Sequence, residues 1–567
     1  MHINETAFGQ LAHKLSGGKF FAHQELSEQL PAGWLQGKSV HLDPEAVADW
    51  KSWAARCVNS PATDPLSDST PNTLSGVNPD TLVGWYGDND SANPQNWSSA
   101  EKAFVAGLIC LYTFTVYLGS ALSTPSTIGV MQQFGVSYAA ASLGLALFVF
   151  GYGSGAMFFS PLSEIPVLGR NWIYIITLFM YLAFSIGAAV APSYGSLIVF
   201  RFLAGFVGSP ALATGGATLQ DMYSIVKLPY GIALWAAAAS MGPALGPVMG
   251  GFAVEAKTWR WPLWIQVWFI APVLVVMILM LPETSHANIL LRRAQRLRKI
   301  TGCTTLRSEA EIEQAKLSTR KIFVEALIRP IQISILDPGT GFMNLYVSLV
   351  YGIYYSFFES FPLVYPVSYG FGLGTTGLTF VCVVLTTVMG AAGYMYYIYY
   401  YIEPKIHQAG KLPILESRLI PAIPASIIMP IGLLIFGWAS RESVHWIVGL
   451  IGSGIYSIGF YVFLQCVILY VPLVYPKYAA SLLAANDFCR STLAAGFVMS
   501  GHPLFKNLGV GPGVSLLAGL TVLCVPALLL LYKYGELLRS KSKFTEKERA
   551  SSSSSTVALE ESKGPVA

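Results

Sequence analysis

The chain consists of long apolar runs separated by polar connections. A helix needs about 20 mostly apolar residues to cross the hydrocarbon of a bilayer, and twelve runs after position 100 reach that length. A polar stretch divides them into six and six, which is typical of two pseudo-repeated halves. The pattern predicts an all-α membrane protein with twelve transmembrane helices in two six-helix bundles. The runs lie at roughly 103–123, 139–160, 172–192, 196–217, 230–253, 262–281, 340–365, 376–401, 419–440, 444–470, 478–500 and 512–534.

The same pattern predicts the domain boundaries. Residues 1–100 carry no run long enough to span a bilayer and form an N-terminal tail, and residues 101–281 form the first bundle. Residues 282–339 form a central loop, residues 340–540 the second bundle, and residues 541–567, which include five consecutive serines, a disordered C-terminal tail.

Lys and Arg in the loops predict the orientation, because cytosolic loops carry an excess of these residues. Loops on the side of the N-terminal tail hold sixteen of them, ten in the central loop alone. The opposite loops hold four: Lys257, Arg260, Arg441 and Lys506. We therefore expect both termini and the central loop in the cytosol.

Composition excludes several classes of function. Hydrophobic residues make up 53% and charged residues 12% of the chain, against roughly a quarter charged in soluble domains. The net charge of +4 comes with no basic stripe for nucleic acid. Seven scattered cysteines give neither a disulfide framework nor a metal spacing. We expect no enzyme, no cofactor and no metal, and without a phosphate-binding loop any pumping must draw on a gradient.

One segment of the central loop is basic and amphipathic. Residues 289–299 alternate apolar positions with five Arg and Lys, a composition that favours a helix lying on the inner membrane face. A regulatory role for this segment is the alternative.

Three runs contain residues that are unusual in a membrane span. The second ends in a glycine-rich stretch followed by Glu164, Gly169 and Arg170. The fourth carries Arg201, which must face a partner or an aqueous cavity because a charge in hydrocarbon is costly. The fifth repeats small residues every four positions, which places them on one helix face and permits close packing. That motif comprises Gly242, Pro243, Gly246, Pro247, Gly250 and Gly251.

Glu359 in the seventh run is the candidate for proton exchange. It should lie in the outer half of its helix among aromatic residues, where desolvation favours the neutral acid and access to water restores the charge. The alternative is a carboxyl that only holds neighbouring helices together. Asp487 competes for the role, but Arg490 follows three residues later on the same helix face and predicts a static ion pair.

A central cavity is expected where aromatic surface and a few polar groups combine. The first and seventh runs offer this mixture, although the tyrosines could also simply pack between helices. The candidate lining residues are Tyr117, Ser120, Ser123, Thr124, Tyr354, Tyr355 and Phe358.

These motifs together resemble the major facilitator superfamily, and within it the fungal drug/proton antiporters with twelve spans. The resemblance covers roughly residues 82–540 and includes Asn93 to Trp97, Leu281 to Thr284 and Ala479 to Ser491. It implies the major facilitator fold, with Glu164, Gly169 and Arg170 as a conformational latch and Arg201 in proton transfer. The glycine and proline motif of the fifth run is similar to the antiporter motif. Glu164 and Gly169 are separated by about two residues more than the usual family loop allows.

The resemblance further implies a proton-coupled efflux transporter that works by alternating access. Drugs, fungicides or fungal secondary metabolites are the expected substrates, and the plasma membrane is the expected location. Protons, the lipid bilayer and the substrate are then the partners of a chain that functions as a monomer. The alternative is a facilitator or importer of a small nutrient or polyamine without proton antiport.

Overall fold

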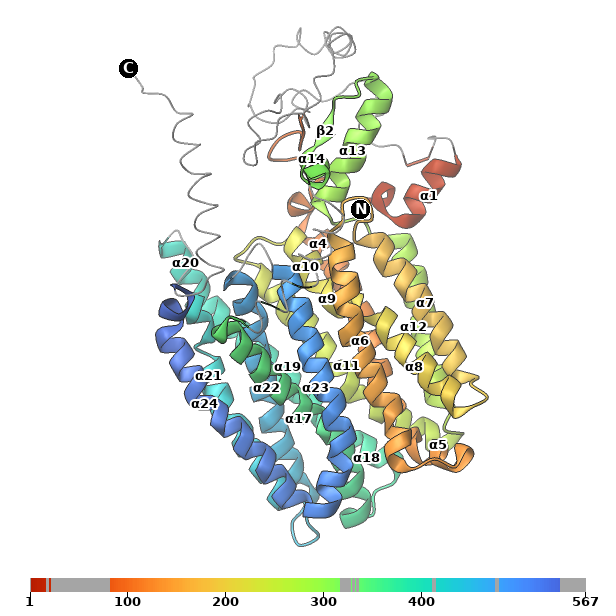
Figure 1. Cartoon of the computed structure of the whole chain (residues 1–567), viewed down its shortest axis with the longest axis vertical. Helices are drawn as coiled ribbons and strands as arrows, with labels where there is room; N and C mark the ends of the chain where they lie inside the picture. Colours follow the sequence, from red (N-terminus) through yellow and green to blue (C-terminus); the bar gives the residue numbers. More distant parts are fainter. Residues whose placement is uncertain are drawn as a thin grey trace.

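The computed structural model describes residues 2–16, 20–21, 82–316, 328, 332, 336–409, 415–474 and 479–540. Long helices run side by side in one bundle, and short elements cover one of its ends (Figure 1). We call that end the cap side and the opposite end the far side.

Each half of the bundle is continuous in sequence. The N-terminal half contains α4 (Ser99–Ala121), α5 (Thr127–Phe134), α6 (Tyr138–Glu164), α7 (Asn171–Ala189), α8 (Tyr194–Gly208), α9 (Pro210–Ala213), α10 (Gly215–Met222), α11 (Leu228–Ala256) and α12 (Trp261–Met280). The C-terminal half contains α17 (Pro338–Tyr369), α18 (Leu373–Thr379), α19 (Val381–Tyr397), α20 (Glu403–Ala409), α21 (Ala422–Ala439), α22 (Trp446–Val474), α23 (Ala479–Leu508) and α24 (Val510–Ser540).

Ten helical stretches among the described residues are long and apolar enough to cross a membrane. The helices α17 and α23 fall outside that group although they have 32 and 30 residues and lie within the bundle (Figure 1). They carry Glu359 in α17 and Asp487 and Arg490 in α23, so polar residues concentrate in the two helices that contact each other and the opposite half.

The fourth predicted span is divided into three consecutive helices. Pro210 begins α9 directly after the end of α8, and α10 begins at Gly215. A proline lacks the backbone N–H that would continue the hydrogen-bond ladder, so a break at this position is expected. The break lies next to the space between the two halves.

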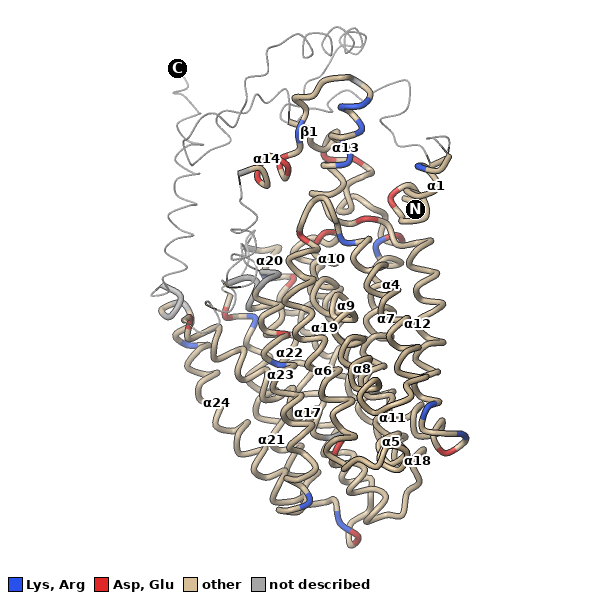
Figure 2. The backbone as a smooth tube through the Cα atoms, turned by 45° about the vertical axis from the view of Figure 1, so that its right-hand side comes forward, with Lys and Arg blue, Asp and Glu red and all other residues tan. Residues whose placement is uncertain are grey.

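Charged side chains avoid the middle of the bundle. Figure 2 shows Lys, Arg, Asp and Glu of the described chain gathered mostly at the two ends, with a broad uncharged zone between them. This is the distribution expected of a protein whose middle contacts hydrocarbon, and the few internal charges are therefore candidates for function.

The cap joins the N-terminal tail to the central loop. It comprises the described residues 2–16, 82–97 and 286–316, with α1 (Ala7–Leu15), α13 (His286–Thr301) and α14 (Glu309–Lys316). The strands β1 (Leu82–Val83) and β2 (Arg307–Ser308) pair in parallel. Glu283 N donates to the carbonyl of Glu5 at 3.1 Å, which fastens the start of the chain to the end of α12.

The prediction that residues 289–299 lie on the membrane face is wrong. These residues belong to α13, which rises away from the bundle (Figure 1). Its apolar residues Ile289, Ala294 and Leu297 are buried, the last two in a small core with Val83 of β1. The amphipathic pattern is real, but the apolar face packs on the N-terminal segment instead of lipid.

Arg293 explains why this helix can be both basic and buried. Its side chain is 1% exposed and lies 3.9 Å from the ring centroid of Tyr86. Its Nη1 donates to Asp90 Oδ2 at 2.7 Å and to the Gly84 carbonyl at 3.1 Å. Burial opposes ionisation of Asp90, yet the hydrogen bonds and charge of Arg293 hold its pKa below the ordinary value.

Candidate transport site

A cavity of about 860 Å³ lies between the two halves on the cap side. Helices α9 to α11 line it from the N-terminal half, and α22 and α23 line it from the C-terminal half. Its walls are mainly apolar, with a few polar groups, which is the composition of small-molecule sites. The polar and aromatic lining residues are Gln95, Gln220, Tyr223, Ser224, Trp235, Arg418, Asn486, Asp487 and Arg490.

An ion pair lines this cavity. Asp487 and Arg490 are 3% and 7% exposed, and Arg490 Nη2 lies 2.7 Å from Asp487 Oδ1. The i,i+3 spacing thus places the two charges together, as the sequence predicts. The guanidinium also lies over the ring of Tyr351, 5.1 Å from its centroid. Asp487 Oδ2 is buried with no hydrogen-bond partner in the described structure.

A layer of tyrosines lies beside the ion pair. Tyr152 of α6 shares a hydrogen bond of 2.7 Å with Tyr351 of α17, so the layer joins the two halves. Only about 20 Å³ of space remains where Tyr117, Tyr354 and Arg490 meet. The large cavity is therefore separated from the far side by packed aromatic side chains.

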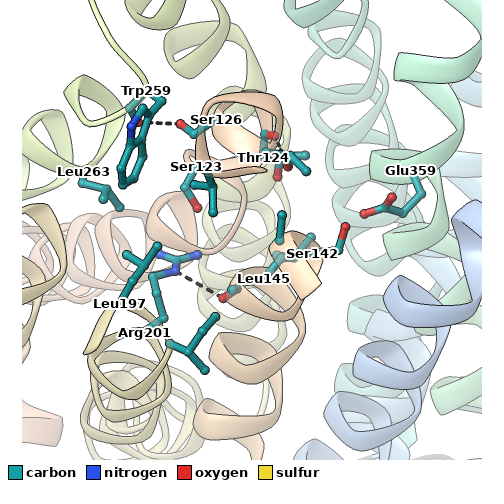
Figure 3. Close-up of a pocket in the computed structure, with 15 residues that line it drawn as sticks. Ser123, Thr124, Ser126, Ser142, Leu145, Leu197, Arg201, Trp259, Leu263 and Glu359 are labelled. Atoms are coloured by element: carbon teal, nitrogen blue, oxygen red, sulfur yellow. Dashed lines mark hydrogen bonds between the residues drawn. The ribbon is translucent and has the colours of Figure 1, made fainter. Parts of the chain in front are cut away.

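A small pocket of about 30 Å³ lies on the far side (Figure 3). Arg201 and Glu359 line it from opposite sides, with Ser142 between them (Figure 3). Glu359 is 2% exposed, and Tyr138 Oη of the N-terminal half donates to its Oε2 at 2.9 Å. The carboxyl is thus buried in the contact between the two halves.

Arg201 is bound by backbone carbonyls of its own half. Its Nη1 and Nη2 donate to Gly119 and Ser120 at 2.8 and 2.9 Å, and its Nε donates to Gly144 at 3.2 Å. The guanidinium also lies 4.6 Å from the ring centroid of Phe148. These contacts tie α8 to α4 and α6, a structural arrangement that leaves the role in proton transfer a prediction.

The predicted cavity residues are spread over three places. Tyr117 and Tyr354 belong to the tyrosine layer, and Ser123 and Thr124 line the far-side pocket. Ser120 and Tyr355 are fully buried between helices, and the side chain of Phe358 lies outside the described part of the chain. The six described residues do not line the large cavity, because the tyrosines pack across the interface and close it off.

The predicted latch residues Glu164 and Arg170 lie near Asp221 of α10. Arg170 Nε donates to Asp221 Oδ2 of α10 at 2.6 Å, whereas Glu164 is exposed at the end of α6. Gly169 has a φ of +69°, and a Cβ there would collide with the carboxylate of Glu283. The hydrogen bonds of Arg170 therefore go to Asp221 of α10, and Glu164 lies close enough to interact with Arg170 through charge alone.

Glu283 closes the same corner. This fully buried carboxylate accepts backbone N–H groups from Arg170, Asn171, Thr284 and Ser285 at 2.9 to 3.2 Å. The donors are the free N–H groups at the start of α7 and before α13, so one side chain caps two chain turns. It belongs to the stretch Leu281 to Thr284 on which the sequence resemblance rests.

The glycine motif of α11 has two packing faces. A Cβ on Gly242 or Gly246 would come within 2.8 Å of α4 atoms, and one on Gly250 would strike the carbonyl of Leu122. Gly251 instead faces α18, where its Cβ would lie 2.5 Å from the Leu373 carbonyl. One helix thus packs closely within its own half and against the other half, with Pro243 and Pro247 inside it.

Comparison with known proteins decides the family. The family model described as Major Facilitator Superfamily matches residues 109–499. The chain belongs to the major facilitator superfamily. It is 38% identical to the MFS-type transporter pyvG of Aspergillus violaceofuscus, covering 96% of this chain and 99% of that one. It is 34% identical to the cycloheximide resistance protein of Candida maltosa, with the same coverage, and 36% identical to fluconazole resistance protein 1 of Saccharomyces cerevisiae, covering 85% and 88%.

Solved structures of other facilitators share the fold. The human organic anion transporter MFSD10 superposes with a TM-score of 0.52 at 16% identity, covering 75% of this chain and 99% of that one. The partially occluded inward open form of the xylose transporter XylE from E. coli gives 0.53 at 14%, covering 77% and 98%. The major facilitator fold predicted from the sequence is thereby confirmed.

Sequence reasoning missed most of the large cavity of this facilitator. Asp487 and Arg490 were visible as charges in an apolar run, but Gln220 and Trp235 carry no signal that separates them from packing residues. The break between α8 and α10 also contributes to the lining and depends on local geometry. Among the described residues, no group of three His, Cys, Asp or Glu is placed to hold a metal ion.

Proposed function

We propose that this member of the major facilitator superfamily exports small, largely apolar organic molecules in exchange for protons by alternating access. One observation carries the proposal: a cavity of about 860 Å³ lies between the halves on the cap side, while the far side is closed by packed side chains. A molecule entering from the cap side would meet mostly apolar walls, with the Asp487–Arg490 pair supplying polar contacts. The names of the relatives, which include resistance to cycloheximide and fluconazole, support export as the direction.

Glu359 is the proposed coupling group. It is a buried carboxyl in the contact that closes the far side, so its surroundings change when the halves rearrange. A group that meets water in one state and apolar surroundings in the other can take up and release a proton once per cycle. Arg201, on the opposite side of the pocket, is proposed to take part in the same proton transfer when the halves rearrange.

The cap side is proposed to face the cytosol of a cell whose plasma membrane holds the chain as a functional monomer. The excess of Lys and Arg in the loops on this side supports the orientation. Export to the outside then runs from the large cavity, through the tyrosine layer, to the far side. The latch residues Glu164, Gly169 and Arg170 and the α11 motif are proposed to act in the rearrangement of the halves.

Proteoliposomes test the proposal. The purified chain is reconstituted with a pH gradient, and movement of radiolabelled fluconazole and cycloheximide is followed together with a pH-sensitive dye. We expect gradient-driven transport of at least one probe, accompanied by proton movement in the opposite direction. Transport that does not respond to the gradient would favour the alternative, which is an importer or a uniporter without proton antiport.

Substitution of Glu359 tests the coupling group. Glu359→Gln keeps the shape but cannot release a proton, so we expect binding without gradient-driven transport. Glu255→Gln is the matched control, because Glu255 also links the halves on the far side by accepting the Gly374 N–H at 2.9 Å, yet it is exposed. Undiminished gradient dependence in Glu359→Gln would remove Glu359 from the mechanism.

A further inference from the structure

Three side chains from three helices meet at the far-side closure. Tyr138 begins α6, Glu359 lies in α17 and His502 in α23. The hydroxyl of Tyr138 donates to Glu359 Oε2 at 2.9 Å, and its ring stacks on His502 with centroids 4.0 Å apart and planes 27° apart. Tyr138 belongs to the N-terminal half and the other two residues to the C-terminal half. The hydrogen bond and the ring stack therefore both cross the interface that must open toward the far side.

The backbone around the group leaves little room for adjustment. A Cβ on Gly501, next to His502, would lie 3.3 Å from Glu359 Cβ, so α23 passes directly beside the carboxyl. Ser137 caps α6 and holds the helix start that carries Tyr138. Rigid placement on both sides means that the hydrogen bond and the ring stack break together when the halves separate.

Other polar groups near the pocket are occupied differently. Arg201 is held by three backbone carbonyls within the N-terminal half, and Ser142 lies between it and Glu359 (Figure 3). Lys506 lies one helical turn beyond His502 on α23. Among the described residues, the hydrogen bond of Tyr138 thus links the opposite half to the buried carboxylate.

We propose that Tyr138 is a positioning residue for proton coupling. In the closed far side its hydroxyl covers the carboxylate of Glu359, and stacking on His502 holds its ring in place. This inference rests on the proposed function of Glu359. In the closed state the phenol replaces water as the hydrogen-bond donor to the carboxylate. Outside protons reach Glu359 only when Tyr138 departs with its half, so proton uptake is tied to opening of the far side.

Accessibility from outside tests the cover. Thr124→Cys places a thiol in the same far-side pocket, and a membrane-impermeant maleimide is applied to intact cells, with labelling of the parent chain subtracted. Tyr138→Phe removes the hydrogen bond between the halves, so we expect labelling of Thr124→Cys to rise several-fold. Tyr194→Phe is the matched control, because Tyr194 Oη donates to the Ala140 carbonyl at 2.6 Å within one half.

Proton leak tests the link to coupling. In proteoliposomes with a pH gradient and no added substrate, we expect Tyr138→Phe to admit protons several-fold faster than the parent. Adding Glu359→Gln to that variant should abolish the leak. A leak caused by general loosening of the fold would persist in the double variant. His502→Phe keeps a ring to stack on and should resemble the parent, whereas His502→Ala should resemble Tyr138→Phe.

The outcomes separate this inference from the proposed function. If Tyr138→Phe and Tyr194→Phe label and leak alike while Glu359→Gln loses coupling, Glu359 keeps its role and the cover is overturned. A second outcome is that Tyr138→Phe raises labelling while Glu359→Gln still couples and does not stop the leak. Tyr138 would then close the far side without acting on Glu359, and its positioning role would be overturned.

Discussion

At the scale of single residues, two glycines with the same backbone conformation have different surroundings. Gly169 and Gly135 have φ values of +69° and +64°, a region that side chains other than glycine rarely adopt. A Cβ on Gly135 meets nothing within 4 Å, whereas one on Gly169 would collide with the buried carboxylate of Glu283. We expect Gly135→Ala to lower the free energy of unfolding by about 1 kcal/mol through backbone strain alone. Gly169→Ala should lower the free energy of unfolding by about 2 kcal/mol more, because the displaced Glu283 carboxylate loses hydrogen bonds from four N–H groups.

Thermal unfolding of both variants in detergent measures this difference. A lower midpoint for Gly169→Ala than for Gly135→Ala supports the collision. Equal midpoints would show that the Glu283 carboxylate moves aside without loss of stability.

The two glycines also show what can be predicted from sequence. Gly135 follows α5 and Gly169 precedes α7, but the contact with Glu283 joins positions more than a hundred apart. The pairing of Asp487 with Arg490 was predictable because three residues separate them, whereas the partner of Arg170 lies fifty-one residues away.

At the scale of elements, the cap depends on one buried ion pair. The side chains of Asp90 and Arg293 are each 1% exposed, and they join the segment after β1 to α13. Removing one partner of a buried pair costs about 3 to 5 kcal/mol, because the other charge stays buried and loses its opposite charge. We therefore expect Asp90→Asn to release residues 82–97 and 286–301, with amide exchange in these segments much faster than in the parent. Arg298→Gln is the matched control, since its pair with Glu311 is 23% and 29% exposed and should be worth less than about 1 kcal/mol.

Acidification should release the cap in the parent chain. Arg293 holds the pKa of Asp90 below its ordinary value of 3.8, so the pair contributes its full stability above that pH. That stability is lost as the pH falls through the lower pKa of the folded chain. Hydrogen exchange of α13 in detergent should accelerate over this acid window in the parent and change little in Asp90→Asn. Equal protection of the parent and of Asp90→Asn at neutral pH would contradict both expectations.

Apolar periodicity predicted the helices well and their surroundings poorly. The four-residue spacing in α11 predicted a closely packed face, and α4 lies against it. The same kind of argument placed α13 on the membrane, because an amphipathic pattern shows that one face is covered and does not show by what. Polar residues in α17 and α23 lowered their hydropathy because they serve the interface between the halves.

At the scale of the whole molecule, the two ends of the bundle differ in charge and in construction. The cap side carries the folded cap and the large cavity, and the far side carries the short helices α5 and α18 (Figure 1). Positive loops are retained in the cytosol during insertion, so the cap should be cytosolic. Lys299→Cys on α13 and Ser443→Cys in the far-side loop after α21 both place a thiol at an exposed position. An impermeant maleimide applied to intact cells should label Ser443→Cys at once and Lys299→Cys only after permeabilisation, with the parent chain as the blank for its native cysteines. Labelling of Lys299→Cys from outside would reverse the orientation, and with it the direction in which a molecule from the large cavity is carried.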